Sequence, residues 1–198
     1  MWKRGYGVVV GVDEVGRGPL AGPVIACAVA AHAKFKVQSA KLKVDDSKKL
    51  SAKKREELYR ILTAHPAIEW GIGRTSEKVI DKINIFQATK LAMQKAVLAL
   101  EKKIGQTVEF LLIDGNFGID MAREQKPIIK GDEKVFSCAA ASIIAKVQRD
   151  KIMIKYHQKY PQYGFDKHKG YGTKQHFEAL RNYGTCEIHR KSFNLIKN

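Results

Sequence analysis

Residues 8–18 read VVVGVDEVGRG, and this stretch decides how the rest of the chain is interpreted. Its first half is a continuous apolar run, which predicts a buried β-strand. Two adjacent carboxylates, Asp13 and Glu14, come where that strand is ending, and the turn residues Gly16, Arg17 and Gly18 follow. Neighbouring acids repel each other, and burial makes their charged forms costly unless protons, basic partners or a cation compensate. The stretch indicates a metal-dependent site that handles phosphate; the alternative is a surface turn with solvated acids.

Length, hydropathy and cysteine usage predict one soluble globular domain. The chain has 198 residues, enough for one good core, and 44% of them are hydrophobic. No apolar run approaches the ~18 residues that a membrane span needs, and the start of the chain lacks a secretory pattern. Cys27, Cys138 and Cys186 are odd in number and widely spaced, so we expect no disulfide framework or metal motif. A reducing, cytoplasmic setting follows as the expected location.

The charge balance points to a polyanionic partner. Lys and Arg number 36 against 20 Asp and Glu, giving a formal net charge of +16. Basic residues crowd two stretches, 34–60 and 146–174. Such an excess is typical of proteins that bind nucleic acid. A lysine-rich surface that only aids solubility is the alternative.

The order of predicted elements indicates a mixed-sheet α/β domain with a helical C-terminal part. Apolar runs predict strands at 8–12, 24–30, 68–72 and 108–113, and a short strand at 127–130. Short links favour antiparallel pairing of the first three strands. Helical patterns predict helices at 51–64 capped by Ser51, at 84–103, from a cap at Ser137 to about 159, and at 173–182 closed by Gly184.

Further acids lie where they could join the first pair. Asp114 ends the strand at 108–113, and if that strand lies parallel to the first, both carboxyl ends share the sheet edge where ligands bind in open α/β sheets. Asp150 lies at the border of the apolar stripe of the long helix, although a simple pairing with Lys146 or Arg149 is the alternative. Asp132 is a rival, in a loop that looks flexible.

The ligand types favour a hard cation. Carboxylate oxygens suit Mg²⁺ or Mn²⁺ and argue against zinc. Four carboxylates around two cations would form the arrangement used for in-line phosphodiester displacement. The histidines, by contrast, lack the spacing of zinc motifs.

Nine motifs, taken together and in order, carry a family resemblance. They are DEVGRGPLAGPV at 13–24, DSKKL at 46–50, NI at 84–85, DGN at 114–116, KGD at 130–132, AAASIIAKVQRD at 139–150, YGF at 163–165, HKGYGT at 168–173 and HRKSF at 189–193. From about residue 11 to 193 the chain resembles bacterial ribonuclease HII, the type 2 ribonuclease H. Each motif alone is modest, and the ordered set is specific.

The resemblance implies a fold and an activity. It implies one ribonuclease H-like catalytic domain, a mixed β-sheet flanked by helices over 1–198, with residues from about 155 to 198 as a helical C-terminal extension. It implies an endoribonuclease that hydrolyses the RNA strand of RNA/DNA hybrids and cuts 5′ of ribonucleotides embedded in duplex DNA. Two metal ions would direct in-line attack of water, leaving 3′-hydroxyl and 5′-phosphate ends.

The resemblance also implies roles for residues. The metal-binding and catalytic acids of the family map onto Asp13, Glu14, Asp114 and Asp150. The turn Gly16, Arg17 and Gly18 would read the 2′-hydroxyl at the cut, and Tyr171 would pack on the nearby sugar. Lys48, Lys146 and Lys169 would contact phosphates, which position a duplex without reading bases.

Other interpretations stay open at this level. Ribonuclease HIII usually carries an extra N-terminal domain and a Lys in the glycine turn, so Arg17 and the 12 residues before Asp13 favour the HII type. A non-catalytic nucleic-acid binding module fits the charge equally well. A phosphotransfer protein fits poorly, because the turn lacks the Lys-Ser/Thr of a P-loop. A monomer is the simplest expectation, and recruitment by a sliding clamp stays open.

Overall fold

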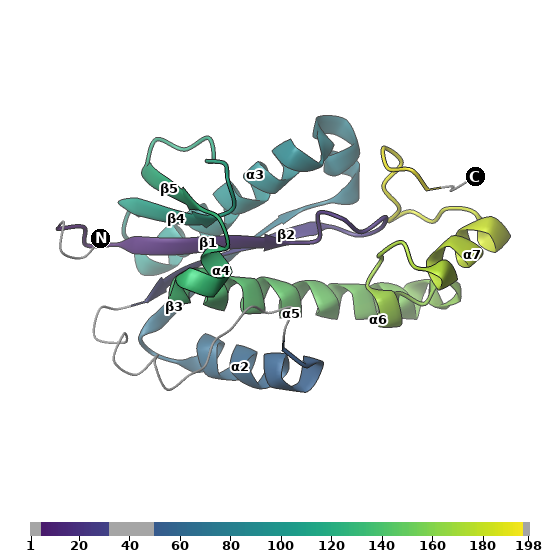
Figure 1. Ribbon diagram of the computed structural model, residues 1–198, viewed down its shortest axis with the longest axis horizontal. Coiled ribbons are helices and arrows are strands. Elements are labelled where there is room, and N and C mark those ends of the chain that lie inside the picture. The colour runs from purple at the N-terminus through teal and green to yellow at the C-terminus, as the bar shows by residue number, and fades with distance from the viewer. Residues whose placement is uncertain (1–4, 32–49, 196–198) are drawn as a thin grey trace.

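The computed structural model describes residues 5–31 and 50–195, and its centre is a five-stranded mixed sheet (Figure 1). The strands are β1 (Val9–Val15), β2 (Val24–Ala31), β3 (Ile68–Thr75), β4 (Phe110–Asp114) and β5 (Glu124–Ile128), in the order β3-β2-β1-β4-β5. The apolar runs form the three central strands, as buried strands of a covered sheet should.

The strand pairing confirms the predicted topology. β1 pairs antiparallel with β2, and β2 pairs antiparallel with β3. β1 pairs parallel with β4, with Val12 opposite Ile113, and β4 pairs parallel with β5. The carboxyl ends of β1 and β4 therefore meet at one edge of the sheet, as the sequence predicted.

Helices cover both faces of the sheet. α3 (Glu77–Ile104) packs on one face, while α2 (Ala52–Ala64) and α5 (Phe136–Lys159) lie on the other (Figure 1). α5 lies so close to β1 that a Cβ added at Gly11 would come within 2.5 Å of the backbone between Ser137 and Cys138. This approach sets α5 directly beneath the strand that carries the first acids.

The C-terminal part forms its own apolar cluster beyond the end of the sheet (Figure 1). It contains the 3₁₀ turn η3 (Pro161–Tyr163), α6 (Phe165–His168) and α7 (Lys174–Tyr183), after the short α4 (Gly131–Lys134) and α5. Leu20, Ala21 and Met153 join this cluster, so the segment after β1 and the end of α5 connect it to the sheet.

Several predicted helix ends are confirmed and two are wrong. Ser51 caps α2 by accepting from Lys54 N–H, and Thr173 and Gly184 bound α7. α3 begins at Glu77 rather than residue 84, and Asn84, with φ 63°, marks a kink instead of the start. α5 is capped at Val135 and not at Ser137, because α4 ends immediately before it and leaves no separate loop.

None of the helices in residues 5–31 and 50–195 is long and apolar enough to cross a bilayer. The buried apolar residues of the two longest helices instead pack in the clusters that cover the two faces of the sheet.

Candidate active site

Asp13 and Asp114 lie side by side at the carboxyl edge of the sheet. Val12 pairs with Ile113 in the parallel register, so the next residues of the two strands are neighbours on the same face. That face is the one under α5, since Asp13 hydrogen-bonds the side chain of Ser142. Asp13 is only 5% exposed, so its carboxylate has little access to bulk water.

Burial and the repulsion of neighbouring acids disfavour the charged forms of Asp13 and Glu14. Desolvation raises the pKa of Asp13 well above its ordinary value, and the charges of Glu14 and Asp114 add to the rise. Desolvation also raises the pKa of Glu14, while the neighbouring Arg17 opposes the rise. A group of carboxylates in this state would be relieved by a cation.

Asp132 belongs to the same neighbourhood, which corrects the expectation of a flexible loop. It is 6% exposed and lies in α4. The preceding Gly131 donates its N–H to Asp114 Oδ1 at 2.7 Å, which fixes α4 against the end of β4. The charges of Asp13, Asp114 and Asp132 all raise the pKa of the buried Cys138 thiol. Acids from three separate segments are thus near enough to Cys138 for their charges to act on its thiol.

Asp150 has a different partner. Its Oδ1 receives Lys146 Nζ at 2.9 Å, one turn earlier on α5, and both side chains are about four-fifths buried, at 22% and 19% exposure. Burial lowers the pKa of Lys146, and Asp150 opposes that shift. This is the pairing that the sequence left open as the alternative. The convergence of Asp150 with the other acids stays a prediction.

Two buried arginines hold the glycine turn from behind. Arg190 donates to the carbonyls of Gly16 at 2.6 Å, Arg17 at 2.9 Å and Gly22 at 2.8 Å. Arg149 donates to the carbonyls of Pro23, Ala21 and Lys169. Sequence reasoning missed this role for both arginines, although the RD and HR pairs stood inside the quoted motifs.

Gly16 shows why the turn requires glycine. Its φ of +96° is a left-handed conformation, and an added Cβ would lie 2.3 Å from Arg149 Nε. Arg17 points outward with 44% of its side chain exposed, contacts Glu14 Oε1 at 3.4 Å and lies over the Phe117 ring. The turn therefore presents its Arg to the surface next to the acids.

Tyr171 lies beside the turn. A Cβ on Gly18 would meet Tyr171 Cε1 at 3.7 Å, and the tyrosine is 42% exposed. Its aromatic face is available for stacking next to the turn. Lys169, two residues earlier, directs its Nζ to the backbone carbonyl of Asp166 and is partly buried. Lys48 lies outside the described residues.

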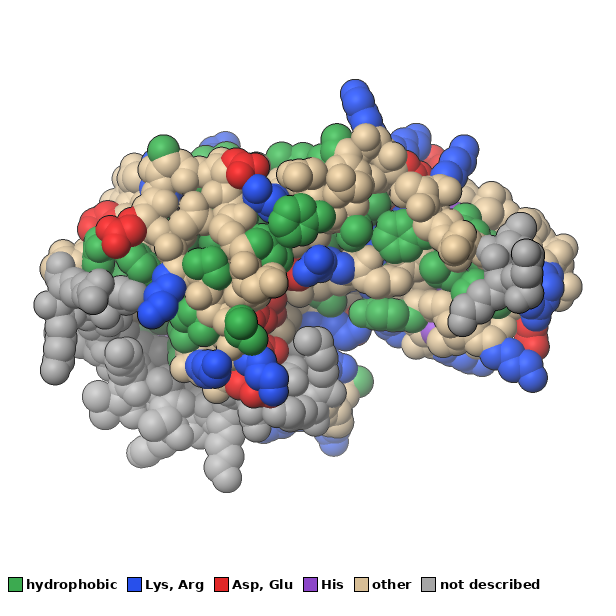
Figure 2. Space-filling model, turned by 45° about the horizontal axis from the view of Figure 1, so that its top comes forward, with side chains coloured by type: hydrophobic (Ala, Val, Ile, Leu, Met, Phe, Trp, Pro, Cys, Tyr) green, Lys and Arg blue, Asp and Glu red, His purple; other side chains and the backbone are tan. Residues whose placement is uncertain are grey.

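The surface around the acids combines both charges. Figure 2 shows acidic side chains in red within a hollow between the sheet body and the C-terminal part, with Lys and Arg side chains in blue around it. A basic rim over an acidic floor suits a polyanion held by cations.

The acids fit divalent cations by chemistry, without forming a ready-made cage. Within residues 5–31 and 50–195, no three His, Cys, Asp or Glu side chains are grouped to hold one ion. Mg²⁺ does not need such a cage, because it binds proteins through one or two carboxylates and takes water and substrate phosphate for the rest. Asp13 and Asp114, with pKa-raising repulsion between them, are such a pair.

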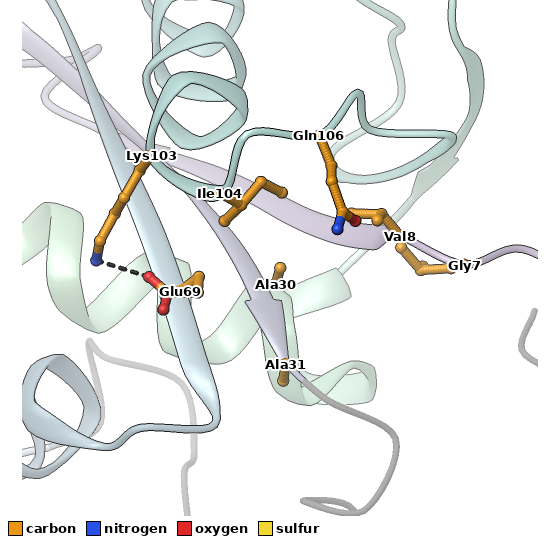
Figure 3. A pocket seen from close by; sticks show the side chains of 9 residues that line it. Gly7, Val8, Ala30, Ala31, Glu69, Lys103, Ile104 and Gln106 are labelled. Carbon is orange, nitrogen blue, oxygen red and sulfur yellow. Dashed lines mark ion pairs between the residues drawn. The ribbon is translucent and has the colours of Figure 1, made fainter.

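A pocket of about 390 Å³ lies elsewhere (Figure 3). Its lining includes Gly7, Val8, Ala31 and the ion pair of Glu69 with Lys103. These residues surround the start of β1 and the end of β2, so the pocket lies at the opposite edge of the sheet from the acids. It has no part in the site.

Solved structures share this fold. The ribonuclease H2 of Pyrococcus horikoshii OT3 matches with a TM-score of 0.74 and 27% identity, covering 95% of this chain and 94% of that one. Ribonuclease HIII of Bst, solved with Mn²⁺, matches with a TM-score of 0.77 over 95% of this chain and 67% of that one, and at 18% identity it shows the fold alone. The fold is therefore of the ribonuclease H type, with a mixed sheet flanked by helices.

Sequence relatives define the family more narrowly. The family model described as Ribonuclease HII matches residues 10–196. Ribonuclease HII of Chlamydia trachomatis serovar A is 50% identical over 98% of this chain and 86% of its own length, and that of Caldanaerobacter subterraneus is 48% identical over 98% and 76%. The chain belongs to the ribonuclease HII family, and it is a nuclease with ribonuclease H activity on RNA/DNA hybrids. The predicted family, fold class and enzyme class are confirmed.

Proposed function

We propose that this enzyme also cuts duplex DNA 5′ of single embedded ribonucleotides, leaving 3′-hydroxyl and 5′-phosphate ends. The observation that carries the proposal is the adjacency of two features: the buried acids at the ends of β1 and β4, and the Arg190-held turn at 16–18 with Tyr171 beside it. The acids supply the chemistry of phosphodiester hydrolysis, and the turn supplies a backbone that can approach a sugar closely. The 2′-hydroxyl is what distinguishes a ribonucleotide within DNA.

Asp13, Glu14 and Asp114 are proposed to hold two Mg²⁺ or Mn²⁺ ions. Such ions would activate the attacking water and stabilise the leaving 3′ oxygen. Family members depend on divalent metal ions. The proposal for this chain therefore concerns which ion it uses, Mg²⁺ or Mn²⁺. The protein's contribution is to bury Asp13 and Glu14 next to each other and to Asp114, because a cation would relieve the desolvation and repulsion that raise the pKa of Asp13 and Glu14.

For the fourth acid, we propose Asp132 in place of Asp150. In support, the charge of Asp132 reaches the same buried thiol as those of Asp13 and Asp114, whereas Asp150 pairs with Lys146 Nζ at 2.9 Å. We propose Asp132 as a ligand or orienting acid at the metal site. Asp150 stays the other candidate for the fourth acid, and its removal would free Lys146.

The substrate contacts are proposed from exposure and position. The exposed Arg17 and the backbone of Gly16 and Gly18 would contact the ribonucleotide, and Tyr171 would stack on its sugar. Lys146 and Lys169, with Lys48, would contact phosphates and fix the duplex in register.

Partner and location follow from the substrate. We propose a monomer that works in the cytoplasm, where a bacterial chain meets chromosomal DNA. The PCNA:RNase HII complex of Archaeoglobus fulgidus shares the fold at 24% identity, which makes a sliding clamp a candidate partner of this chain.

The decisive experiment uses three labelled duplexes: DNA with one ribonucleotide, an RNA/DNA hybrid and DNA alone. Cleavage should require Mg²⁺ or Mn²⁺, should fall 5′ of the ribonucleotide and should leave DNA alone intact. Asp13→Asn should abolish turnover while retaining salt-sensitive duplex binding. Asp120→Asn is the matched control, because Asp120 is an exposed acid that pairs with Lys90 at 2.6 Å, and it should cut normally. Metal-independent binding without cutting would instead identify a binding module.

A further inference from the structure

Two fully buried histidines of the C-terminal part have no role in the chemistry proposed above. His176 lies in α7 and is 0% exposed, and His189 follows α7 and is 2% exposed. Their Nε2 atoms are 3.0 Å apart. Both rings pack among aromatic side chains, with Phe165 5.5 Å from the His176 ring and 5.8 Å from the His189 ring. Buried polar rings are kept only when their nitrogens are satisfied.

The backbone groups that contact Nδ1 of His189 and Nδ1 of His176 determine the direction of the hydrogen bond between the two rings. The backbone N–H of Cys186 lies 2.9 Å from His189 Nδ1, closer than the Cys186 carbonyl at 3.3 Å, and an N–H can only donate. Nδ1 therefore accepts, and the proton of His189 is on Nε2. His176 Nε2 then accepts that proton at 3.0 Å. His176 Nδ1 carries its own hydrogen and donates it to the carbonyl of Tyr171 at 2.9 Å, since a carbonyl can only accept. The chain of bonds is consistent only when both rings are neutral.

Burial supports the neutral state. Desolvation lowers the pKa of His176 to about 4 and also lowers the pKa of His189. The ring of His168 stacks on His176 at 4.6 Å and further disfavours a second positive charge there.

The chain of bonds ends on the turn that presents Tyr171. The same carbonyl also accepts from Thr173 N–H at 2.8 Å, so it is fully used. The neighbouring Gly170 carbonyl accepts Leu20 N–H at 2.8 Å, and Ala21 forms a backbone bridge with His189. The tyrosine turn, the segment after the glycine turn and the C-terminal segment are therefore tied together.

We propose that His176 and His189 are positioning residues that hold Tyr171 against the turn at 16–18, and so determine how well the enzyme cuts at a single embedded ribonucleotide. This inference rests on the proposed function. A Cβ added at Gly18 would lie 3.7 Å from Tyr171 Cε1, so the ring lies beside the turn, and the histidine pair holds the backbone that carries the ring. A hybrid offers a 2′-hydroxyl at every nucleotide of its RNA strand, whereas a single embedded ribonucleotide offers only one, so cutting there depends most on this contact.

A purely structural role for the pair is the competing explanation. In that case a variant would lower stability and would affect all substrates and backgrounds alike. Double-mutant cycles separate the two, because residues that act through one another show non-additive effects.

The experiment measures kcat and KM on a duplex with one ribonucleotide for His176→Phe, Tyr171→Ala and the double variant. The phenyl ring keeps the volume and removes both bonds. We expect His176→Phe to lower kcat by about 10-fold or more with little change in KM, as for a small displacement of a contacting group. In the Tyr171→Ala background the same change should cost about 2-fold or less.

Rescue and control variants sharpen the result. His176→Asn keeps a donor where Nδ1 stood and should restore most of kcat, whereas His176→Gln places its amide toward His189 and should not. If His176→Phe does not fold, the comparison of Asn with Gln carries the same prediction. Cys186→Ala removes the Sγ–Nδ1 contact of 3.2 Å but keeps the N–H that directs His189, and it should behave as wild type.

An equal loss from His176→Phe with and without Tyr171 would overturn the proposal, as would equal kcat for the Asn and Gln variants. The proposed function is tested separately by the wild-type enzyme. If wild type cuts hybrids but not single ribonucleotides, the proposed function fails before any histidine variant is compared, and the positioning proposal falls with it.

Discussion

Replacing Arg190 with Met tests whether the glycine turn is held by its buried guanidinium. The side chain makes four hydrogen bonds, of 2.6 to 2.9 Å, to three backbone carbonyls of the segment 16–22. Burial lowers the pKa of Arg190 to about 9, so the group remains charged at neutral pH. Methionine has a similar length and no donor, and therefore leaves those carbonyls without their partner.

The magnitude follows from the carbonyls that water cannot reach. Arg17 is exposed and its carbonyl can be solvated, but those of Gly16 and Gly22 are left in the interior. Each buried acceptor without a partner costs about 1–3 kcal/mol, and removing a desolvated charge offsets part of this. We expect a net loss of about 2–4 kcal/mol. For a chain of this size that corresponds to a fall in Tm of about 5–15 °C.

Thermal and urea unfolding of Arg190→Met measure this loss directly. Lys191→Met is the matched control, because Lys191 is exposed and contacts Asp81 through its backbone N–H, and it should leave Tm unchanged. The variant should also lose kcat/KM on the single-ribonucleotide duplex at temperatures where it is folded. An unchanged free energy of unfolding, with normal cutting, would refute the idea that Arg190 holds the turn.

Three further predictions follow from the site and the core. Asp132→Asn should lower kcat by about 100-fold or more, as loss of a metal-site group does. Asp150→Asn should act mainly by freeing Lys146. A larger loss of kcat from Asp150→Asn than from Asp132→Asn in the same cleavage assay would make Asp150 the fourth acid. The stability that neutral His176 gives is lost as pH falls from about 6.5 to 4, because the unfolded chain takes up a proton in this range and the folded chain does not. Urea titrations should therefore show that the free energy of unfolding of wild type exceeds that of His176→Phe by less at pH 4 than at pH 6.5, with a change of at most about 3 kcal/mol. A difference that stays constant with pH would contradict this prediction. Gly73→Ala should destabilise the protein by several kcal/mol, since its Cβ would lie 1.9 Å from the Ala92 carbonyl; a Tm equal to wild type would show that α3 can move away freely.

Short-range sequence patterns predicted most of the strands and helices. The apolar runs at 8–12 and 24–30, the caps at Ser51 and Thr173, and the stop at Gly184 depend on residues within one turn or one strand, and the structure confirms them. The meeting of Asp13 with Asp114 was also predictable, because parallel neighbours bring their carboxyl ends together.

The fourth acid and the arginines needed the tertiary structure. The sequence predicted a flexible loop at Asp132, whereas in the structure Gly131 N–H bonds Asp114 and fixes this segment. For Asp150 the sequence left two partners open, the other acids and Lys146, and the structure shows the pairing with Lys146. Arg149 and Arg190 are charged residues that hydropathy assigns to the surface, yet both are 0% exposed. Apart from the Lys169 carbonyl, 20 residues from Arg149, the backbone carbonyls that they bind lie 126 to 174 residues away.

The sequence by itself therefore determined the central strands, most of the helices and the family, because these follow from periodicity, short-range capping and ordered motifs, and it predicted Asp13, Glu14, Asp114 and Asp150 as site acids. Only the tertiary structure brought α4, which carries Asp132, against Asp114, and only the tertiary structure shows what holds the turn at 16–18 and how His176 and His189 connect to Tyr171. Those contacts join residues far apart in the chain, and a side chain's partner across such a separation is set by the packing of whole elements and not by the residues beside it.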